Sequence, residues 1–216
     1  MKFTGERILG KQRKADVRFA DHPVRYNFAK QFCIWKKVLD IACGVWYGSD
    51  MIADVAEKIT WVDVDASAIV QAQSLYHKDN LTYILWDGNT IPLEDESVDV
   101  VVSFETIEHI VEYNHFLKEI ERVLKKGWVL LMSTPNYRGE IVKNIYHVSN
   151  FTTESFVKAV SDVFTIKKQY FQGKHFYPIP GRGILEAFFR IKKDIEIRSE
   201  KPAFHHHVSM VLAEKK

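Results

Sequence analysis

The sequence is poor in cysteine and has no long run of hydrophobic residues. Cys33 and Cys43 are the only two cysteines among its 216 residues. Two isolated thiols do not make the disulfide framework on which small secreted domains depend, so a reducing compartment is expected. No apolar run approaches the roughly 18–20 residues of a membrane-spanning helix, and the first residues lack the apolar core of a signal peptide. These absences predict a cytoplasmic protein without a membrane span.

An excess of charge of one sign is also absent. The 30 Lys and Arg residues against 28 Asp and Glu residues give a formal net charge of +2 and a pI near 8.4. A chain this balanced does not indicate nucleic acid as a partner. Internal repeats and low-complexity tracts are missing too. With 46% hydrophobic residues the chain can bury one full core, so we predict a single domain over residues 1–216.

Strand-like and helix-like segments alternate along the chain, which is typical of a mostly parallel α/β sheet. The expected strands are 37–41, 59–63, 81–85, 98–103 and 128–133, and the expected helices are 21–31, 50–57, 66–77 and 112–125. A further helix starts with Thr152 or Thr153 as its cap. Two alternating runs at 163–170 and 207–213 then pair antiparallel. This order predicts a seven-stranded, mostly parallel sheet with helices on both faces and an antiparallel last strand.

The stretch from Val38 to Gly48 carries the most functional information. An apolar run ending at Ile41 leads into a turn with Gly44 and Gly48, and an amphipathic segment follows. Strand, glycine turn and helix bring backbone N–H groups up to a nucleotide-like ligand. Asp63 ends the next apolar strand, 23 positions after Asp40. A carboxylate at that distance is placed to accept both ribose hydroxyls of an adenosine.

With these motifs the sequence resembles the class I S-adenosylmethionine-dependent methyltransferases, over nearly the whole chain and most closely the ubiquinone- and sugar-associated subgroup. The first motif of that family is matched by four residues and its ribose-binding acid by a fifth: Asp40, Ala42, Gly44, Gly48 and Asp63. Asp87, followed by Gly88, matches the acid that reads the adenine amine. Phe104 opens the segment that follows the fourth strand. The resemblance implies that these residues bind S-adenosylmethionine.

The resemblance also implies an activity and a division of the domain. It implies an N-terminal arm and helix over residues 1–35, a Rossmann-like cofactor-binding core over 36–136, and a substrate-side segment with the last strands over 137–216. The reaction would methylate oxygen or nitrogen of a small-molecule acceptor, in a monomer or homodimer. Segments 3–7 and 147–151 look like those of a subgroup associated with sugar or cell-envelope metabolism. His109 and His147 are the candidate catalytic bases, because imidazole titrates near neutrality. A second interpretation of His147 is a hydrogen-bonded residue at the entry to a helix.

Two positions depart from the family pattern. The family usually has glycine where Trp46 stands and a polar or acidic residue where Val45 stands. Glycine allows the backbone to approach the ligand closely, whereas an indole brings a large apolar side chain to the same place. In one interpretation Trp46 swings away and lines the pocket. In the other it fills the pocket, and the chain is a cofactor-impaired methyltransferase fold that serves as a binding or assembly partner.

The residues Glu105, Glu108 and His109 have spacings of three and four, which would place them on one helical face. A similar Glu-x-x-Glu-His is associated with a divalent cation in ubiquinone-type O-methyltransferases, whereas in other relatives the same letters shape the substrate side of the pocket. We expect a pocket wall and no metal. A nicotinamide-dependent dehydrogenase is a further alternative, but Asp87 and the lack of a clear G-x-G-x-x-G disfavour it.

Overall fold

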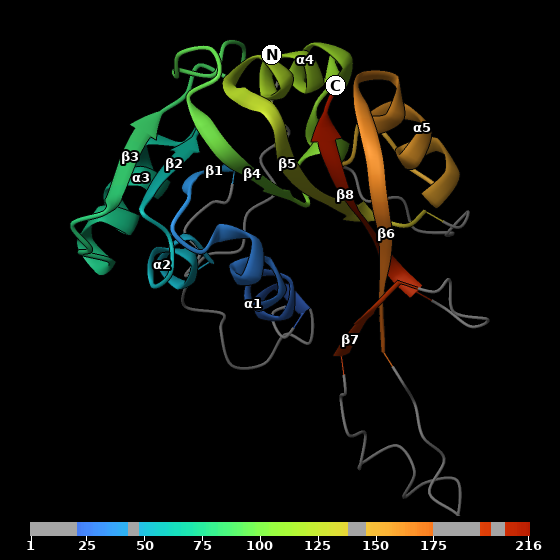
Figure 1. Ribbon diagram of the computed structural model, residues 1–216, viewed down its shortest axis with the longest axis horizontal. Helices are drawn as coiled ribbons and strands as arrows, with labels where there is room; N and C mark the ends of the chain where they lie inside the picture. The colour runs from blue at the N-terminus through green and yellow to red at the C-terminus, as the bar shows by residue number, and fades with distance from the viewer. Residues whose placement is uncertain (1–20, 43–47, 138–145, 175–194, 200–205) are drawn as a thin grey trace, which may run out of the picture.

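The computed structural model describes residues 21–42, 48–137, 146–174, 195–199 and 206–216, and Figure 1 labels their elements. The helices are α1 (Asp21–Cys33), α2 (Gly48–Ala53), α3 (Ala66–Leu75), the 3-10 turn η3 (Ile107–His109), α4 (Tyr113–Val123) and α5 (Thr153–Val163). The strands are β1 (Lys37–Ile41), β2 (Lys58–Asp63), β3 (Leu81–Leu85), β4 (Val98–Phe104), β5 (Leu124–Pro135), β6 (Phe164–Lys174), β7 (Ile195–Arg198) and β8 (His206–Lys215).

The described strands form one sheet in the order β3-β2-β1-β4-β5-β8-β6-β7. Strands β1 to β5 are parallel, and β8 runs antiparallel to both of its neighbours, β5 and β6. The seven expected strands and the antiparallel last strand are confirmed. One strand more is present, because the short β7 pairs antiparallel with the end of β6. Its Ile-Glu-Ile-Arg sequence carries the period-two alternation of a strand.

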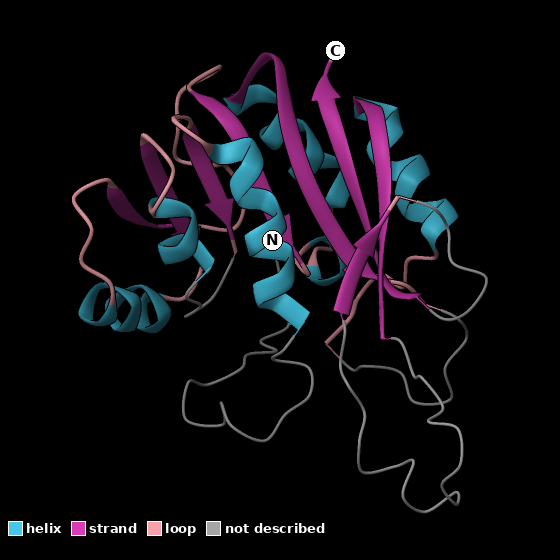
Figure 2. Ribbon diagram, turned by 60° about the horizontal axis from the view of Figure 1, so that its bottom comes forward, coloured by secondary structure: helices cyan, strands magenta, loops and turns pink. Residues whose placement is uncertain are grey.

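Helices cover both faces of the sheet, as predicted. Helices α1 and α2 lie on one face, and α4 and α5 lie on the other (Figures 1 and 2). The buried side of α4 consists of Phe116, Leu117, Ile120 and Val123, all of them fully buried. Burying each such side chain stabilises the fold by about 1.5–3 kcal/mol relative to leaving it exposed. An apolar core on each face of the sheet therefore holds it between two helical layers. The ends of the sheet stay available for ligands.

Helix α2 is shorter than predicted, Gly48–Ala53 instead of 50–57. The side-chain amide of Asn80, which precedes β3, donates hydrogen bonds to the carbonyls of Ala53 and Ala56 at 2.8 and 2.9 Å. Carbonyl groups at a helix end need such partners. A side chain distant in sequence thus satisfies the end of α2, which local periodicity cannot reveal.

Helix α5 settles which of two adjacent threonines is the cap. Thr152 is the N-cap, because its side chain accepts a hydrogen bond from the Ser155 amide in a capping box. The Thr153 hydroxyl instead contacts Asn136 Oδ1 at 3.2 Å and Ser209 Oγ at 2.7 Å. These contacts tie the start of α5 to the end of β5 and to β8.

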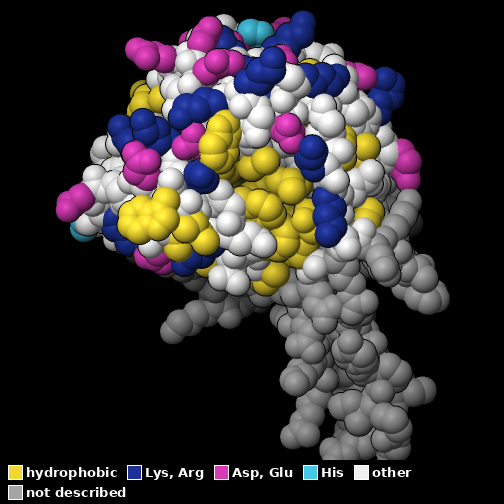
Figure 3. Space-filling view, viewed as in Figure 1, with side chains coloured by type: hydrophobic (Ala, Val, Ile, Leu, Met, Phe, Trp, Pro, Cys, Tyr) yellow, Lys and Arg dark blue, Asp and Glu magenta, His cyan; other side chains and the backbone are white. Residues whose placement is uncertain are grey.

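Apolar side chains also gather on the α1 face of the sheet. Figure 3 shows a cluster of them in the view of Figure 1. Phe28 of α1, Val129 of β5 and Leu212 of β8 are partly buried members of the apolar core on this face. Within the described ranges, no helix has the length and apolar composition needed to cross a membrane.

Candidate functional site

The sheet order reverses direction at β1, which lies between β2 and β4. Open α/β sheets place their ligands at such a switch point, outside the carboxyl ends of the strands. Ala42 follows β1 with a φ of +58°, in the left-handed region that non-glycine residues seldom adopt. Its amide donates to the Val62 carbonyl at 2.8 Å. The chain thus turns sharply as it leaves β1, at the edge where the sequence predicts the cofactor.

Asp40 lies in β1 with no exposed surface. Its carboxylate accepts hydrogen bonds from the Tyr26 hydroxyl at 3.2 Å and the Ser49 hydroxyl at 2.5 Å. Burial, and then the charge of Asp40, raise the pKa of the Cys33 thiol to about 12. Asp40 therefore joins α1 and α2 to the end of β1 and holds the frame around the switch point.

Gly48 begins α2 directly against the ring of Tyr26. A Cβ atom at this position would lie 2.3–2.5 Å from the Tyr26 ring carbons, closer than atoms can approach. The ring cannot move aside easily, because it packs edge-on against Phe104 with centroids 5.2 Å apart and is hydrogen-bonded to Asp40. The structure thus explains the glycine at position 48 by the space that Tyr26 needs. Phe104 is almost fully buried in this contact.

Two more predicted residues lie after successive strands. Asp63 ends β2 with only 6% of its surface exposed, and its Oδ1 accepts the Asp65 amide at 2.9 Å. Asp87 follows β3 and is exposed, and its Oδ1 accepts the amides of Asn89 and Thr90 at 2.8 and 3.0 Å. These two hydrogen bonds lower the pKa of Asp87, and the bond from Asn89 has the larger effect. Both side chains are therefore hydrogen-bond acceptors at the edge of the sheet where the cofactor is predicted. A carboxylate can accept several hydrogen bonds, so each can accept more from a ligand.

Gly88, between Asp87 and Asn89, has a φ of +81°, which glycine adopts without strain. It closes the turn that Asp87 stabilises. The predicted residue Gly44, and with it Val45 and Trp46, lies outside the described residues.

Beyond β4 the expected helical face takes a different form. Glu105 has a φ of +56° and precedes the single 3-10 turn η3. Its amide donates to the Ser133 carbonyl at 3.1 Å, and its Oε1 accepts the Ser133 hydroxyl at 2.9 Å. Glu105 is thus bound to β5, and only Glu108 and His109 lie in η3.

Glu108 is a carboxyl group with 1% of its surface exposed. Its Oε2 accepts the Thr134 hydroxyl at 3.0 Å, whereas its Oε1 has no hydrogen-bond partner within the described part of the chain. Burial, and then the charge of Glu105, raise the pKa of Glu108 well above its usual value. The protonated form is favoured here, and a protonated carboxyl can donate a hydrogen bond.

The two predicted catalytic residues meet in space. The rings of His109 and His147 lie edge to face with centroids 5.0 Å apart. The Glu108 carbonyl accepts the amides of Val148 and Ser149 at 2.9 and 3.1 Å, which brings the segment after residue 146 to η3. Glu108, His109 and His147 each offer an atom within 4.8 Å of the others, so this trio could hold a divalent metal ion.

The tautomer of His109 follows from its contact with a carbonyl. Its Nδ1 lies 3.0 Å from the Tyr146 carbonyl oxygen, which can only accept, so Nδ1 carries the proton. In the neutral ring Nε2 is then the basic nitrogen. It lies 3.9 Å from Glu108 Oε1, beyond hydrogen-bond distance. His109 therefore presents a proton-accepting nitrogen on the side of Glu108.

Sequence reasoning missed Arg25, which lies beside Tyr26 in α1. It is 1% exposed, and its Nη1 donates to the Gln172 side-chain oxygen in β6 at 2.6 Å. A signal was available, because position 25 lies one turn before Ala29 and two turns before Cys33 on the buried side of the helix. A charged residue on a buried helical face calls for an explanation.

Comparison with known proteins finds similarity to methyltransferases. Residues 39–132 match the model of a family described as a methyltransferase domain. A probable S-adenosylmethionine-dependent methyltransferase of Mycolicibacterium smegmatis is 38% identical over 136 residues, 62% of this chain and 51% of that protein. A phthiotriol/phenolphthiotriol dimycocerosates methyltransferase of Mycobacterium ulcerans is 29% identical over 110 residues, 50% of this chain and 41% of that protein.

Among solved structures, an S-adenosylmethionine-dependent methyltransferase from Aquifex aeolicus matches with a TM-score of 0.67 at 15% identity, covering 95% of this chain and 96% of that one. At that identity the likeness shows the fold alone. The chain spans about half the length of the curated relatives that it matches. The family match runs from β1 into β5 and so includes Asp40, Asp63 and Glu108.

Proposed function

We propose that this chain is a class I S-adenosylmethionine-dependent methyltransferase, which transfers the methyl group of S-adenosylmethionine to oxygen or nitrogen of a small-molecule acceptor. The carboxyl ends of β1, β2 and β3 form what we call the cofactor half of the site. The acceptor half consists of η3, residues 146–149, and the ends of β5 and β6. We further propose one domain over residues 1–216, divided at 35 and 136, that acts in the cytoplasm as a monomer or homodimer, without nucleic acid.

The observation that carries this proposal is the buried carboxylate of Asp63 at the end of β2, beside the sharp exit of the chain from β1. A ribose offers two adjacent hydroxyl donors, and a carboxylate accepts both. Asp87, after the neighbouring strand, would accept from the adenine amine. The two carboxylates, as hydrogen-bond acceptors, thus fit the hydrogen-bond donors of the cofactor. The walls and turns around the cofactor would be formed by the remaining predicted residues, Ala42, Gly44, Gly48, Gly88 and Phe104.

The sulfonium of S-adenosylmethionine supplies an electrophilic methyl group, so the protein mainly has to align the acceptor and exclude water. His109 Nε2, fixed as the basic nitrogen by the Tyr146 carbonyl, would take the proton of an acceptor hydroxyl or ammonium group. His147, edge-on to His109, limits the freedom of that ring. We therefore assign His109 as the base. His147 would hold the His109 ring in place or act as the base in its stead.

We infer an acceptor from sugar or cell-envelope chemistry. Segment 147–151 resembles that subgroup, and one relative is named for its action on phthiotriol and phenolphthiotriol dimycocerosates. Methyl transfer from labelled S-adenosylmethionine to sugar, phenol and polyol acceptors tests this directly. Labelled product from none of these three classes would contradict the choice of acceptor, while leaving the cofactor assignment to be judged separately.

Calorimetric titration with S-adenosylhomocysteine tests the cofactor assignment. Binding in the micromolar range is expected. If the Trp46 indole instead fills the cleft, wild-type protein binds weakly and Trp46→Gly restores binding, because glycine permits the close backbone approach that the ligand needs. Absence of binding in both proteins would overturn the proposal and favour a cofactor-impaired binding partner.

A further inference from the structure

Arg25 is a buried cation that forms no ion pair with a carboxylate of the described residues. Its side chain makes one hydrogen bond, to Gln172, and its Nε has no partner among the residues that the structure describes. None of the described ion pairs includes Arg25. Burying an unpaired charge is costly, and native structures pair such groups or bind something to them. The guanidinium therefore retains donors for a ligand.

The partner of Arg25 places this guanidinium in the acceptor half. Gln172 lies near the end of β6, which runs in the same direction as β5, because β8 is antiparallel to both. The end of β6 is therefore at the same edge of the sheet as η3. Glu108, a buried residue of η3, lies at this edge as well. Its Oε1 also lacks a partner in the described chain.

We propose that Arg25 binds an anionic oxygen group of the methyl acceptor, a carboxylate or a phosphate, with Gln172 holding the guanidinium in place. This inference rests on the proposed methyl transfer and narrows its acceptor class. A planar guanidinium presents parallel N–H donors that match two oxygens of such a group.

The cofactor's own carboxylate is a poorer match for Arg25. The strand order puts β4, β5 and β8 between β1 and β6, so β6 lies four strand spacings from the switch point. At about 4.8 Å per spacing, this is roughly 19 Å. Adjacent helical residues point about 100° apart. Tyr26 reaches Asp40 in β1, whereas Arg25 reaches β6. The guanidinium is thus directed to the far side of the site.

Calorimetry with simple anions tests this assignment, using benzoate against the neutral benzamide, and inorganic phosphate, with and without saturating S-adenosylhomocysteine. We expect wild-type protein to bind benzoate or phosphate at least about tenfold more tightly than benzamide. Arg25→Met should abolish that preference, and Arg25→Lys should retain part of it. Lys30→Met is the matched control, since Lys30 is a cation of the same helix bound to Asp54, and it should change nothing.

Three results would overturn the inference. The first is wild-type protein that binds S-adenosylhomocysteine but binds the anionic and the neutral probes equally tightly, or binds neither kind of probe. The second is an unchanged anion preference in both Arg25 variants. The third is loss of S-adenosylhomocysteine in Arg25→Lys with retention of 5′-methylthioadenosine, which lacks the carboxylate. Wild-type protein that binds no S-adenosylhomocysteine would instead count against the proposed function, so the two failures are distinct.

Discussion

The cofactor half and the acceptor half of the site use their charged groups in different ways. In the first, Asp40 accepts two hydroxyl hydrogen bonds and Asp87 accepts two backbone amides. In the second, one oxygen of Glu108 and one nitrogen of Arg25 have no partner among the described residues. Buried polar groups are almost always hydrogen-bonded, so exceptions require a reason. In the proposed function, the chain itself organises the cofactor half, whereas a ligand completes the acceptor half.

The largest effect is expected at Asp63 in the cofactor half. Hydrogen bonds to a charged group contribute about 1.5–3 kcal/mol each. Asp63→Ala should therefore weaken S-adenosylhomocysteine binding at least about tenfold in calorimetry, and leave the anion preference of the acceptor half unchanged. Asp65→Ala is the control, because that carboxylate caps α3 through Ser67. Equal affinity in wild type and Asp63→Ala would remove Asp63 from the site.

Gly48 tests whether packing organises the cofactor half. Gly48→Ala should lower the free energy of unfolding by about 1–3 kcal/mol, because the added Cβ meets the Tyr26 ring. Urea unfolding measures this loss, and the loss should shrink in a Tyr26→Ala background, where the ring is gone. Gly127→Ala provides the contrast, since no atom lies within 4 Å of its Cβ and only its φ of +76° is unfavourable. Its cost should be the same in both backgrounds.

Glu108 tests the acceptor half through pH. Since its pKa is raised in the folded protein, the stability that it contributes is complete below the ordinary value of 4.5 and is lost as the pH rises toward the folded pKa. Wild-type stability should therefore fall relative to Glu108→Gln, by up to about 1.4 kcal/mol per pH unit in that window. Urea unfolding from acidic to neutral pH measures the difference.

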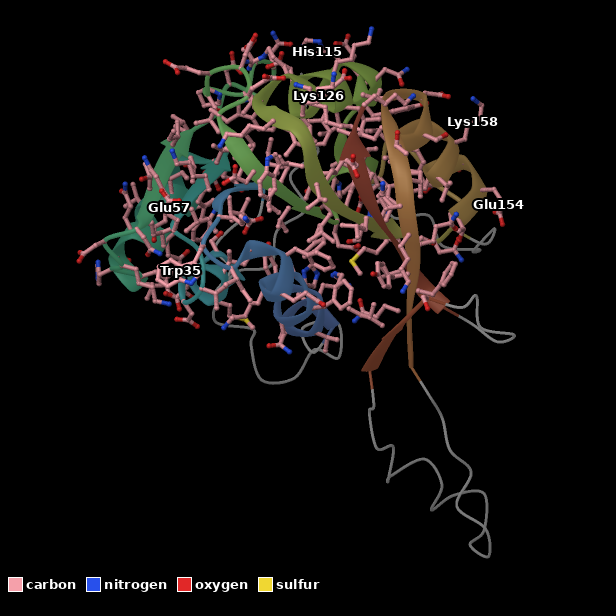
Figure 4. The ribbon with its side chains drawn as sticks, in the orientation of Figure 1. Trp35, Glu57, His115, Lys126, Glu154 and Lys158 are labelled. Carbon is pink, nitrogen blue, oxygen red and sulfur yellow. The ribbon has the colours of Figure 1, made fainter. Side chains whose placement is uncertain are left out.

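The exposed Glu57 supplies the control for this measurement (Figure 4), and Glu57→Gln should follow the wild-type profile. Parallel profiles for wild type and Glu108→Gln would show that Glu108 titrates normally. The contrast between the two halves would then rest on Arg25 alone.

The smallest effect is expected at Trp35, which touches neither half. Trp35 lies in the turn between α1 and β1, is 77% exposed and has a φ of +55° (Figure 4). Left-handed backbone costs a non-glycine residue about 1 kcal/mol or more. Trp35→Gly should raise the free energy of unfolding by up to about 1 kcal/mol, measured by urea unfolding. Trp35→Ala keeps the Cβ and should gain nothing; an equal gain would assign the effect to the indole.

Local patterns in the sequence predicted the parts of this structure that local physics determines. Alternating apolar segments predicted where the core strands lie along the chain, and the position of Asp63 followed from the end of an apolar run. The contact between Arg25 and Gln172 spans 147 positions, and no periodicity links them. The fit between Tyr26 and Gly48 is likewise a packing event between two helices. Residues that act across the sheet were therefore the ones that the sequence did not reveal.

The position of β8 has a consequence for the order of folding. Strand β8 comes after β6 in the chain yet lies between β5 and β6, and it pairs with both along most of its length. Strands β5 and β6 therefore cannot reach their final neighbours until residues 206–215 have been inserted. Non-local pairing of this kind is slow. Until that step is complete, two long strand edges stay unpaired and can recruit other chains. A product truncated before residue 206 should therefore aggregate.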